Sequence, residues 1–286
     1  MGRHPRSPPA GQHLMTGPAA NGRDLILEMQ SEPALTPVLW WLGHSGFAVK
    51  YRGIVFYLDP CLGDIRGRRR LVPAPLRPEQ VVNAGLVLCT HAHRGHIDPA
   101  TLPGILAASP RCRVVLPRSA AGHAFSAGVP YERMTSTGAD MRVEYVSEGV
   151  RAVVYSIPSG HPELDWSAEH GYPYLGYVLR FDGFTIYHAG DCRRYDGLVE
   201  RLRPYRASVA LLPIAGPANL APAEAAQLAE DIGASWVVPM HYGTFAGQEP
   251  DASRFIDHML GQRPSLPFKV FAAGEKWRVP VEAAVL

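Results

Sequence analysis

The sequence predicts a layered α/β fold in a single domain. From residue 38 onward, short runs rich in β-branched and aromatic residues are separated by glycine-containing turns, which is the pattern of β-strands. In the last third of the chain, strand candidates alternate with helix candidates, as is typical of α/β proteins. With 286 residues and a hydrophobic content of 47%, the chain can bury a sizeable core.

The N-terminal segment has a different composition. Residues 1–36 are rich in Pro, Gly, Ala and Arg, and we expect a mostly disordered tail that allows a short ordered piece near residues 24–30. The predicted domain covers residues 37–286. The apolar run at residues 25–27 is too short for a signal peptide, and no stretch approaches the ~20 apolar residues of a membrane span. We therefore expect a cytoplasmic protein without a membrane partner.

Charge and cysteine usage narrow the function further. A formal net charge of +2 is too small to indicate nucleic acid or an anionic membrane as a partner, so a small-molecule substrate is the expected one. The cysteines are scattered and form no C-x-x-C pair, which argues against a disulfide framework and against a thiolate zinc site; they are Cys61, Cys89, Cys112 and Cys192. The sequence does not decide whether the protein forms a homo-oligomer.

Turn signals organise the secondary-structure prediction. Arg52-Gly53 is a plausible hairpin turn between strands at 47–51 and 54–58, and Asp182-Gly183 is a strong one between strands at 176–181 and 184–188. Further strand candidates cover residues 38–42, 85–89, 113–116, 141–146, 151–157, 207–212, 236–239 and 268–271. Helix candidates cover residues 195–202 and 221–232, and a short helix is expected to start near residue 98.

A dense histidine cluster follows the buried strand candidate at 85–89. His91, His93 and His96 precede Asp98 within eight residues. In extended backbone His91 and His93 point to the same side, and a helical turn would bring His96 back toward His93. Neutral imidazole binds zinc and suits iron, copper and nickel. The cluster predicts a metal site, and the alternative interpretation is a histidine-rich surface loop.

Polar residues recur at other strand ends. His91, His161, Asp191 and His241 each lie a few residues beyond a predicted strand. Ligand sites in layered α/β folds form at this edge, where several strands end together. Taken singly, His161 and His241 could be capping or surface residues and Asp191 a turn residue. Taken together, the four predict one site.

Two other features allow more than one interpretation. Asp59 ends the strand at 54–58, where it is either a ligand, a support that orients a metal-bound imidazole, or a simple turn residue before Pro60. The basic loop at residues 65–70 is either solvated surface or a rim that attracts an anionic substrate.

Several motifs together carry a family resemblance. They are Trp41-Leu42-Gly43-His44-Ser45-Gly46-Phe47, Leu58-Asp59-Pro60, the cluster from His91 to Asp98, Tyr187-His188-Ala189-Gly190-Asp191, Asn219-Leu220, Glu224-Ala225, Val238-Pro239-Met240-His241-Tyr242-Gly243 and Gly274-Glu275. From residue 38 to its end, the chain resembles the metallo-β-lactamase superfamily, in the branch typified by L-ascorbate-6-phosphate lactonase.

This resemblance implies an αββα sandwich with a metal site between the two sheets. The cofactor would be one or two divalent ions, zinc or manganese, with iron as a further possibility. Asp191 would bridge the two ions and Asp59 would support the ligands. The first ion would be held by His91, His93 and His161, and the second by His96 and His241.

The chain departs from the family pattern at one position. The motif His-x-His-x-Asp-His has Gly95 where the family has Asp. That Asp ligates the second metal and helps to hold or deprotonate the nucleophilic water, and glycine can do neither. We therefore expect a weaker second site. Asp98 could supply a carboxylate if the loop is remodelled, and the simpler interpretation is that it caps a helix or orients a histidine.

These observations predict a metal-dependent hydrolase of the lactonase, esterase or phosphoesterase type, with a metal-activated water attacking a small lactone or ester, amide or phosphoester. Proton handling is expected from Asp191 or Asp98, and oxyanion stabilisation from His241 or His188. One alternative is an iron-dependent oxidative enzyme with the same fold. Another is a hydrolytically impaired, small-molecule-binding descendant, because of Gly95. The sequence does not decide whether His44 lines the pocket or packs near it.

Overall fold

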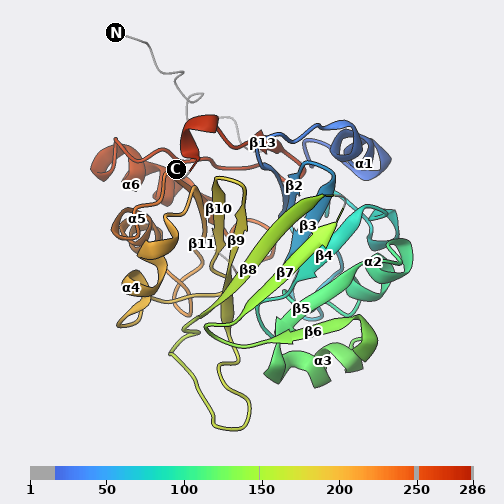
Figure 1. Ribbon diagram of the computed structural model, residues 1–286. Coiled ribbons are helices and arrows are strands. Elements are labelled where there is room, and N and C mark those ends of the chain that lie inside the picture. Colours follow the sequence, from blue (N-terminus) through green and yellow to red (C-terminus); the bar gives the residue numbers. More distant parts are fainter. Residues whose placement is uncertain (1–16, 148, 248–250, 285–286) are drawn as a thin grey trace.

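Two β-sheets packed face to face form the centre of the computed structural model, and helices cover both outer faces (Figure 1). The structure describes residues 17–147, 149–247 and 251–284. This arrangement is the αββα sandwich that the sequence predicts.

The first sheet has the strand order β13-β1-β2-β3-β4-β5-β6. The predicted turn at Arg52-Gly53 is confirmed, because it joins the antiparallel strands β2 and β3. From β3 to β6 the strands run parallel, so their carboxyl ends meet at one edge. The strands are β1 (Val38–Gly43), β2 (Gly46–Tyr51), β3 (Ile54–Leu58), β4 (Ala84–Leu88), β5 (Arg113–Pro117), β6 (Met134–Thr137) and β13 (Lys276–Arg278).

The second sheet has the strand order β12-β11-β10-β9-β8-β7. The predicted hairpin at Asp182-Gly183 is confirmed between β9 and β10. Strands β10, β11 and β12 run parallel. The strands are β7 (Arg142–Ser147), β8 (Val150–Pro158), β9 (Leu175–Phe181), β10 (Phe184–His188), β11 (Val209–Pro213) and β12 (Trp236–Met240).

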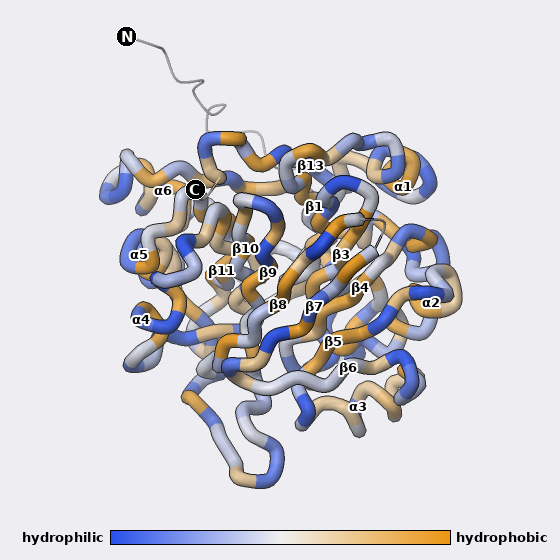
Figure 2. The backbone as a smooth tube through the Cα atoms, in the orientation of Figure 1, coloured by the Kyte–Doolittle hydropathy of each residue, from blue (hydrophilic) through white to orange (hydrophobic). Residues whose placement is uncertain are grey.

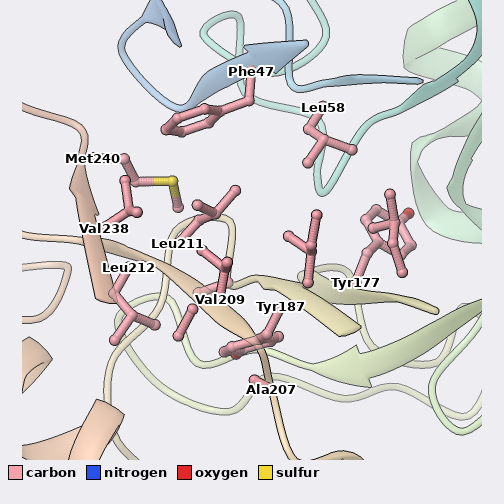
Figure 3. Close-up of a cluster of buried hydrophobic side chains, with 14 of the residues drawn as sticks. Phe47, Leu58, Tyr177, Tyr187, Ala207, Val209, Leu211, Leu212, Val238 and Met240 are labelled. Atoms are coloured by element: carbon pink, nitrogen blue, oxygen red, sulfur yellow. The ribbon is translucent and has the colours of Figure 1, made fainter. Parts of the chain in front are cut away.

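Side-chain alternation along the strands divides the apolar residues between two cores. In β1, Leu39 and Trp41 belong to the core between the sheets, whereas Trp40 and Leu42 belong to the core under the helices. Figure 3 shows Phe47 of the first sheet facing Met240 of the second across the inner core. Figure 2 shows hydrophobic residues concentrated on the central strands, which is the pattern of strands covered on both faces.

Six α-helices form the outer layers in the described part of the chain. On the first sheet lie α1 (Gly22–Ser31), α2 (Leu102–Ala108) and α3 (Ala121–Ser126); on the second lie α4 (Leu198–Leu202), α5 (Pro222–Asp231) and α6 (Ser253–Gln262) (Figure 1). Short 3₁₀ turns are η1 (Pro78–Gln80), η2 (Arg118–Ala120), η3 (Tyr131–Arg133), η4 (Arg203–Tyr205) and η5 (Val281–Ala283). No helix within the described residues has the length and apolar character needed to span a bilayer.

Helix α1 covers the ordered piece that was expected near residues 24–30 of the N-terminal segment. Its residues Leu25, Ile26 and Met29 are buried in the outer core of the first sheet. The Lys50 ammonium group on β2 donates hydrogen bonds to the last carbonyls of the helix, at 2.6 Å from Met29 O and 3.0 Å from Gln30 O. These contacts join residues 22–31 to the domain; residues 1–16 of the expected tail lie outside the described residues.

Three predicted elements differ from the structure. The short helix expected to start near residue 98 begins at Leu102, as α2, after a turn at residues 99–101. The strand predicted at 268–271 is reduced to one isolated bridge between Phe268 and Val237, and the last strand is β13 instead. The helix predicted at 195–202 begins at Leu198, because the chain first makes a turn at residues 196–197 that ends with Gly197 in the left-handed region, at φ +93°.

Candidate metal centre

The carboxyl ends of four strands place the predicted ligands around one cavity. The histidine cluster follows β4, His161 follows β8, Asp191 follows β10 and His241 follows β12. The cavity has a volume of about 380 Å³ and is also lined by His44, Arg68, Arg94, Gly95 and Asn219. The six predicted ligand residues therefore lie together, although they span 150 positions of the chain.

One group of side chains has the composition of a first metal site. The donor atoms of His91, His93, His161 and Asp191 lie within 4.8 Å of one another. Asp191 Oδ2 is 3.4 Å from His161 Nε2 and 3.8 Å from His91 Nε2. His91 Nε2 is in turn 2.9 Å from His93 Nδ1. These are the residues that the family resemblance assigned to the first ion.

A second group lies beside the first. The donor atoms of His44, His96 and His241 are also within 4.8 Å of one another. The other oxygen of Asp191, Oδ1, is 3.2 Å from His241 Nε2 and 3.4 Å from His96 Nε2. The two oxygens of Asp191 thus face different groups, as expected of a bridging carboxylate.

Hydrogen bonds behind the histidines fix which ring nitrogen faces the centre. His96 Nδ1 lies 2.7 Å from Asp59 Oδ2, and His161 Nδ1 donates to the carbonyl of Ala218 at 2.9 Å. The Asp59 carboxylate is itself held by Thr90, whose N–H and hydroxyl donate to it at 2.8 and 2.7 Å. Carboxylate and carbonyl partners of this kind orient metal-binding imidazoles and leave the Nε2 atom for the metal. Asp59 lies where the support role requires it.

Burial keeps most of the imidazoles neutral. It lowers the pKa of His44 and His91 well below the usual value, and it also lowers the pKa of His93 and His241. Neutral imidazole is the form that binds a metal.

Opposite charges outweigh burial at His96 and at Asp191. Burial opposes the charge of His96, but Asp59 and Asp191 outweigh it and raise the pKa of His96 to about 10. Burial also opposes the charge of Asp191, yet the neighbouring His241 and His96 hold its pKa well below the usual range. Positive charge is therefore favoured between these two carboxylates.

A buried carboxylate oxygen is a further indication that the centre fits a divalent cation. Asp191 Oδ1 is buried and makes no hydrogen bond with any residue that the structure describes. An unsatisfied buried carboxylate oxygen is costly, and coordination to a cation removes that cost. The donor set of imidazoles and one carboxylate suits zinc or iron.

Unusual backbone conformations coincide with the centre. His44, Asp59 and His241 have positive φ angles of +54°, +39° and +65°, which non-glycine residues adopt rarely. Backbone hydrogen bonds hold these conformations: His241 N–H donates to His44 O at 2.9 Å, and Asp59 N–H donates to Leu88 O at 2.8 Å. Such conformations concentrate at functional sites.

Two residues that the sequence suggested for catalysis lie elsewhere. Asp98 accepts hydrogen bonds from Gly63 N at 2.9 Å, from Ala100 N at 3.0 Å and from the Thr101 hydroxyl, and it does not line the cavity. It holds the turn that precedes α2, whose N-cap is Thr101, so the helix-capping role does not apply to the helix itself and the histidine-orienting role is not seen in these contacts. His188 Nε2 donates to the Ser45 carbonyl at 2.8 Å and its Nδ1 accepts the Gly190 N–H at 3.2 Å, so neither ring nitrogen is left to donate to a substrate oxyanion.

The sequence did not decide whether His44 lines the pocket or packs near it. In the structure, His44 lines the cavity and belongs to the second group. Arg68, in the basic loop, also reaches the cavity, and Arg66 does not. The signal that could have pointed to His44 is the glycine at position 95, which leaves room for another side chain.

Comparison with known proteins agrees with this geometry. The sequence profile of the beta-lactamase superfamily domain matches residues 55–242. A UPF0173 metal-dependent hydrolase from Methanoculleus marisnigri is 30% identical over 249 residues, which cover 86% of this chain and 98% of that protein. The chain belongs to the metallo-β-lactamase superfamily.

Two solved structures share the fold. Igni18, a metallo hydrolase from Ignicoccus hospitalis, is 24% identical with a TM-score of 0.65, covering 84% of this chain and 97% of its own. An isothiocyanate hydrolase from Delia radicum gut bacteria is 19% identical with a TM-score of 0.68, covering 85% and 100%. None of these matches distinguishes the L-ascorbate-6-phosphate lactonase branch, which stays a prediction.

Proposed function

We propose that this metal-dependent hydrolase acts on small molecules in which an anionic group lies near a lactone, ester, amide or phosphoester bond. The observation that carries the proposal is the position of Arg68 in the wall of the cavity that contains both ligand groups. The cavity volume of about 380 Å³ suits a small molecule.

The residues of the first group would hold the catalytic ion. They are His91, His93, His161 and Asp191. When bound, a divalent ion lowers the pKa of a water molecule toward ~7 and polarises a carbonyl or phosphoryl oxygen. Zinc or iron suits the imidazoles of this group, and manganese is the third ion to be tested.

While only the first ion is bound, Asp191 is the proton acceptor in this proposal; with a second ion bound, both of its oxygens would be ligands. Its Oδ1 atom has no hydrogen bond within the described residues, so it can orient a water molecule and accept a proton from it. No other carboxylate lines the cavity in the part of the chain that the structure describes. His241 presents Nε2 to the same oxygen at 3.2 Å, where it would either bind a second ion or, with one ion present, donate to the substrate oxyanion.

Arg68 would bind the anionic group of the substrate. Arg68 lies in the wall of the cavity that contains the centre. After burial and the neighbouring titratable groups, its charge makes only a minor contribution to the lowered pKa values of His44, His93 and His241. Arg94 lines the cavity as well. Guanidinium groups recognise carboxylates and phosphates through paired hydrogen bonds.

The test is a comparison of paired anionic and neutral substrates in each bond class, with zinc-, manganese- or iron-loaded protein. Arg68→Gln should raise KM for the anionic member by about 10-fold or more, since hydrogen bonds to charged groups contribute about 1.5–3 kcal/mol. The matched control is Arg66→Gln in the same loop, which should change nothing. Equal losses on anionic and neutral substrates would contradict the proposal. Activity that requires iron together with oxygen would favour the oxidative alternative.

A further inference from the structure

We propose that His44 performs the metal-binding role of the aspartate that Gly95 replaces. A second ion site would then consist of His44, His96, His241 and the Oδ1 atom of Asp191. The inference rests on the metal-dependent function proposed above, and it replaces the sequence-based expectation of a weakened second site with that of a rebuilt one.

The first argument is steric. A Cβ atom built on Gly95 would lie 2.3 Å from His44 Nε2 and 2.9 Å from His44 Cδ2, far inside van der Waals contact. The imidazole therefore occupies the space in which an aspartate side chain at position 95 would begin. In this conformation the tip of the His44 ring would have to shift to admit an aspartate at position 95.

The second argument is that His44 is held in place. Its backbone is left-handed, at φ +54°, and only 2% of the residue is exposed. Its N–H lies 2.6 Å from Thr244 Oγ1, and its carbonyl accepts hydrogen bonds from Trp41 Nε1 at 3.0 Å and from His241 N at 2.9 Å. The last bond joins the backbones of two members of the site, so His44 and His241 are positioned together.

The third argument is the donor geometry. The donor atoms of His44, His96 and His241 lie within 4.8 Å of one another. Ligands around one tetrahedral ion with Zn–N bonds of about 2.0–2.1 Å are about 3.4 Å apart, so the rings need only small shifts to bind the same ion. The ring centroids of His44 and His241 are 4.0 Å apart, and those of His44 and His96 are 5.3 Å apart. His44 thus reaches the same point from the β1–β2 turn that an aspartate would reach from the histidine loop.

The exchange has a consequence for metal choice. It replaces a carboxylate by a neutral imidazole, so the second site has one negative charge fewer and three nitrogen donors. Imidazole suits zinc and iron, whereas carboxylates suit manganese and magnesium. The second site should therefore prefer zinc to manganese.

The experiment is a titration of the metal-stripped full-length protein with Zn²⁺ or Mn²⁺, with bound ions counted by mass spectrometry. The wild type should bind two zinc ions. His44→Ala should keep the first ion and lose affinity for the second by about 100-fold or more, since the loss of even an outer partner of a ligand costs 10–100-fold. The double variant His44→Ala/Gly95→Asp should recover the second ion and gain affinity for manganese. The control is His123→Ala, which removes an exposed histidine from α3 and should behave as wild type.

A measurement on the unmodified protein covers the case in which His44→Ala does not fold. Long-range ¹H–¹⁵N NMR spectra of the histidine rings should show a ring nitrogen of His44 shifting with the second equivalent of zinc. The inference would be overturned, and the proposed function left intact, if the His44 ring signals did not shift on addition of zinc. The same would follow from a folded His44→Ala protein that still binds two ions with wild-type affinity. A wild type that binds no metal would overturn both.

Discussion

Asp59 provides a sharp test of how the centre is held. Its Oδ2 atom lies 2.7 Å from His96 Nδ1, and its Oδ1 atom accepts the Thr90 N–H at 2.8 Å. In Asp59→Asn the amide oxygen can keep the bond to Thr90, so the amide NH₂ group faces His96. Because that group only donates, His96 must present an unprotonated Nδ1 to it and carry its proton on Nε2, the atom that faces Asp191.

The magnitude follows from this change of tautomer. A proton on Nε2 blocks the metal-binding atom of His96. Moving that proton to Nδ1 would free Nε2, but the Nδ1–H would then face the NH₂ group of the substituted side chain, which also only donates. Loss of a partner of this kind costs metal affinity by about 10–100-fold, or about 1.4–2.8 kcal/mol. The effect should fall on the second ion, since His96 belongs to that group.

The assay is zinc binding by calorimetry, with thermal melts to check folding. Asp98→Asn is the matched control, because both carboxylates are buried, at 0% and 2% exposure, and only Asp59 contacts a histidine of the centre. The control should melt at a lower temperature and bind zinc normally. Wild-type zinc affinity in a folded Asp59→Asn protein would refute the reasoning.

Three further predictions concern stability. In denaturant melts, Gly190→Ala should lower the free energy of unfolding by about 1–3 kcal/mol, because Gly190 has φ +62° and a Cβ there would lie 2.8 Å from Thr90. Gly197→Ala, with φ +93° and no atom within 4 Å of the added Cβ, should lower it less. Burial would raise the pKa of Glu32, but Arg278, 2.6 Å away, lowers it. The stabilisation of the fold by ionised Glu32 is therefore present above about pH 4.3 and lost as the pH falls through the lower pKa of the folded state. Glu32→Gln should therefore reduce the difference in melting temperature between neutral and acid pH, and an unchanged difference would contradict this. Chelation should lower the melting temperature and zinc should restore it, because ions that bind only the folded state stabilise it; a melting temperature indifferent to both would contradict a metal-bound state.

The sequence predicted most strands of the two sheets, but not β6 or β13, and most of the residues that gather at the centre, for identifiable physical reasons. Strand periodicity and the two glycine turns locate β2, β3, β9 and β10, since these signals are local. The convergence of His161 and Asp191 on the histidine cluster follows from strand ends, because parallel strands of a layered fold end at a common edge.

The remaining features depend on contacts between distant segments. Asp59 and Asp98 have similar local sequences, each followed by proline, and only the folded chain turns one toward His96 and the other toward Gly63 and Thr101. His44 is 51 positions from Gly95, and no spacing rule connects them. The strand predicted at 268–271 has a suitable pattern, but pairing partners decide whether a run becomes a strand.

The most direct test of the account is the metal content of the wild type and of Asp191→Ala after equilibration with excess zinc and removal of free ions. Asp191 supplies one oxygen to each ligand group. The account predicts two zinc ions in the wild type and a loss of both from high-affinity binding in Asp191→Ala. Wild-type protein that retains no zinc, or an Asp191→Ala protein that retains both ions, would contradict it.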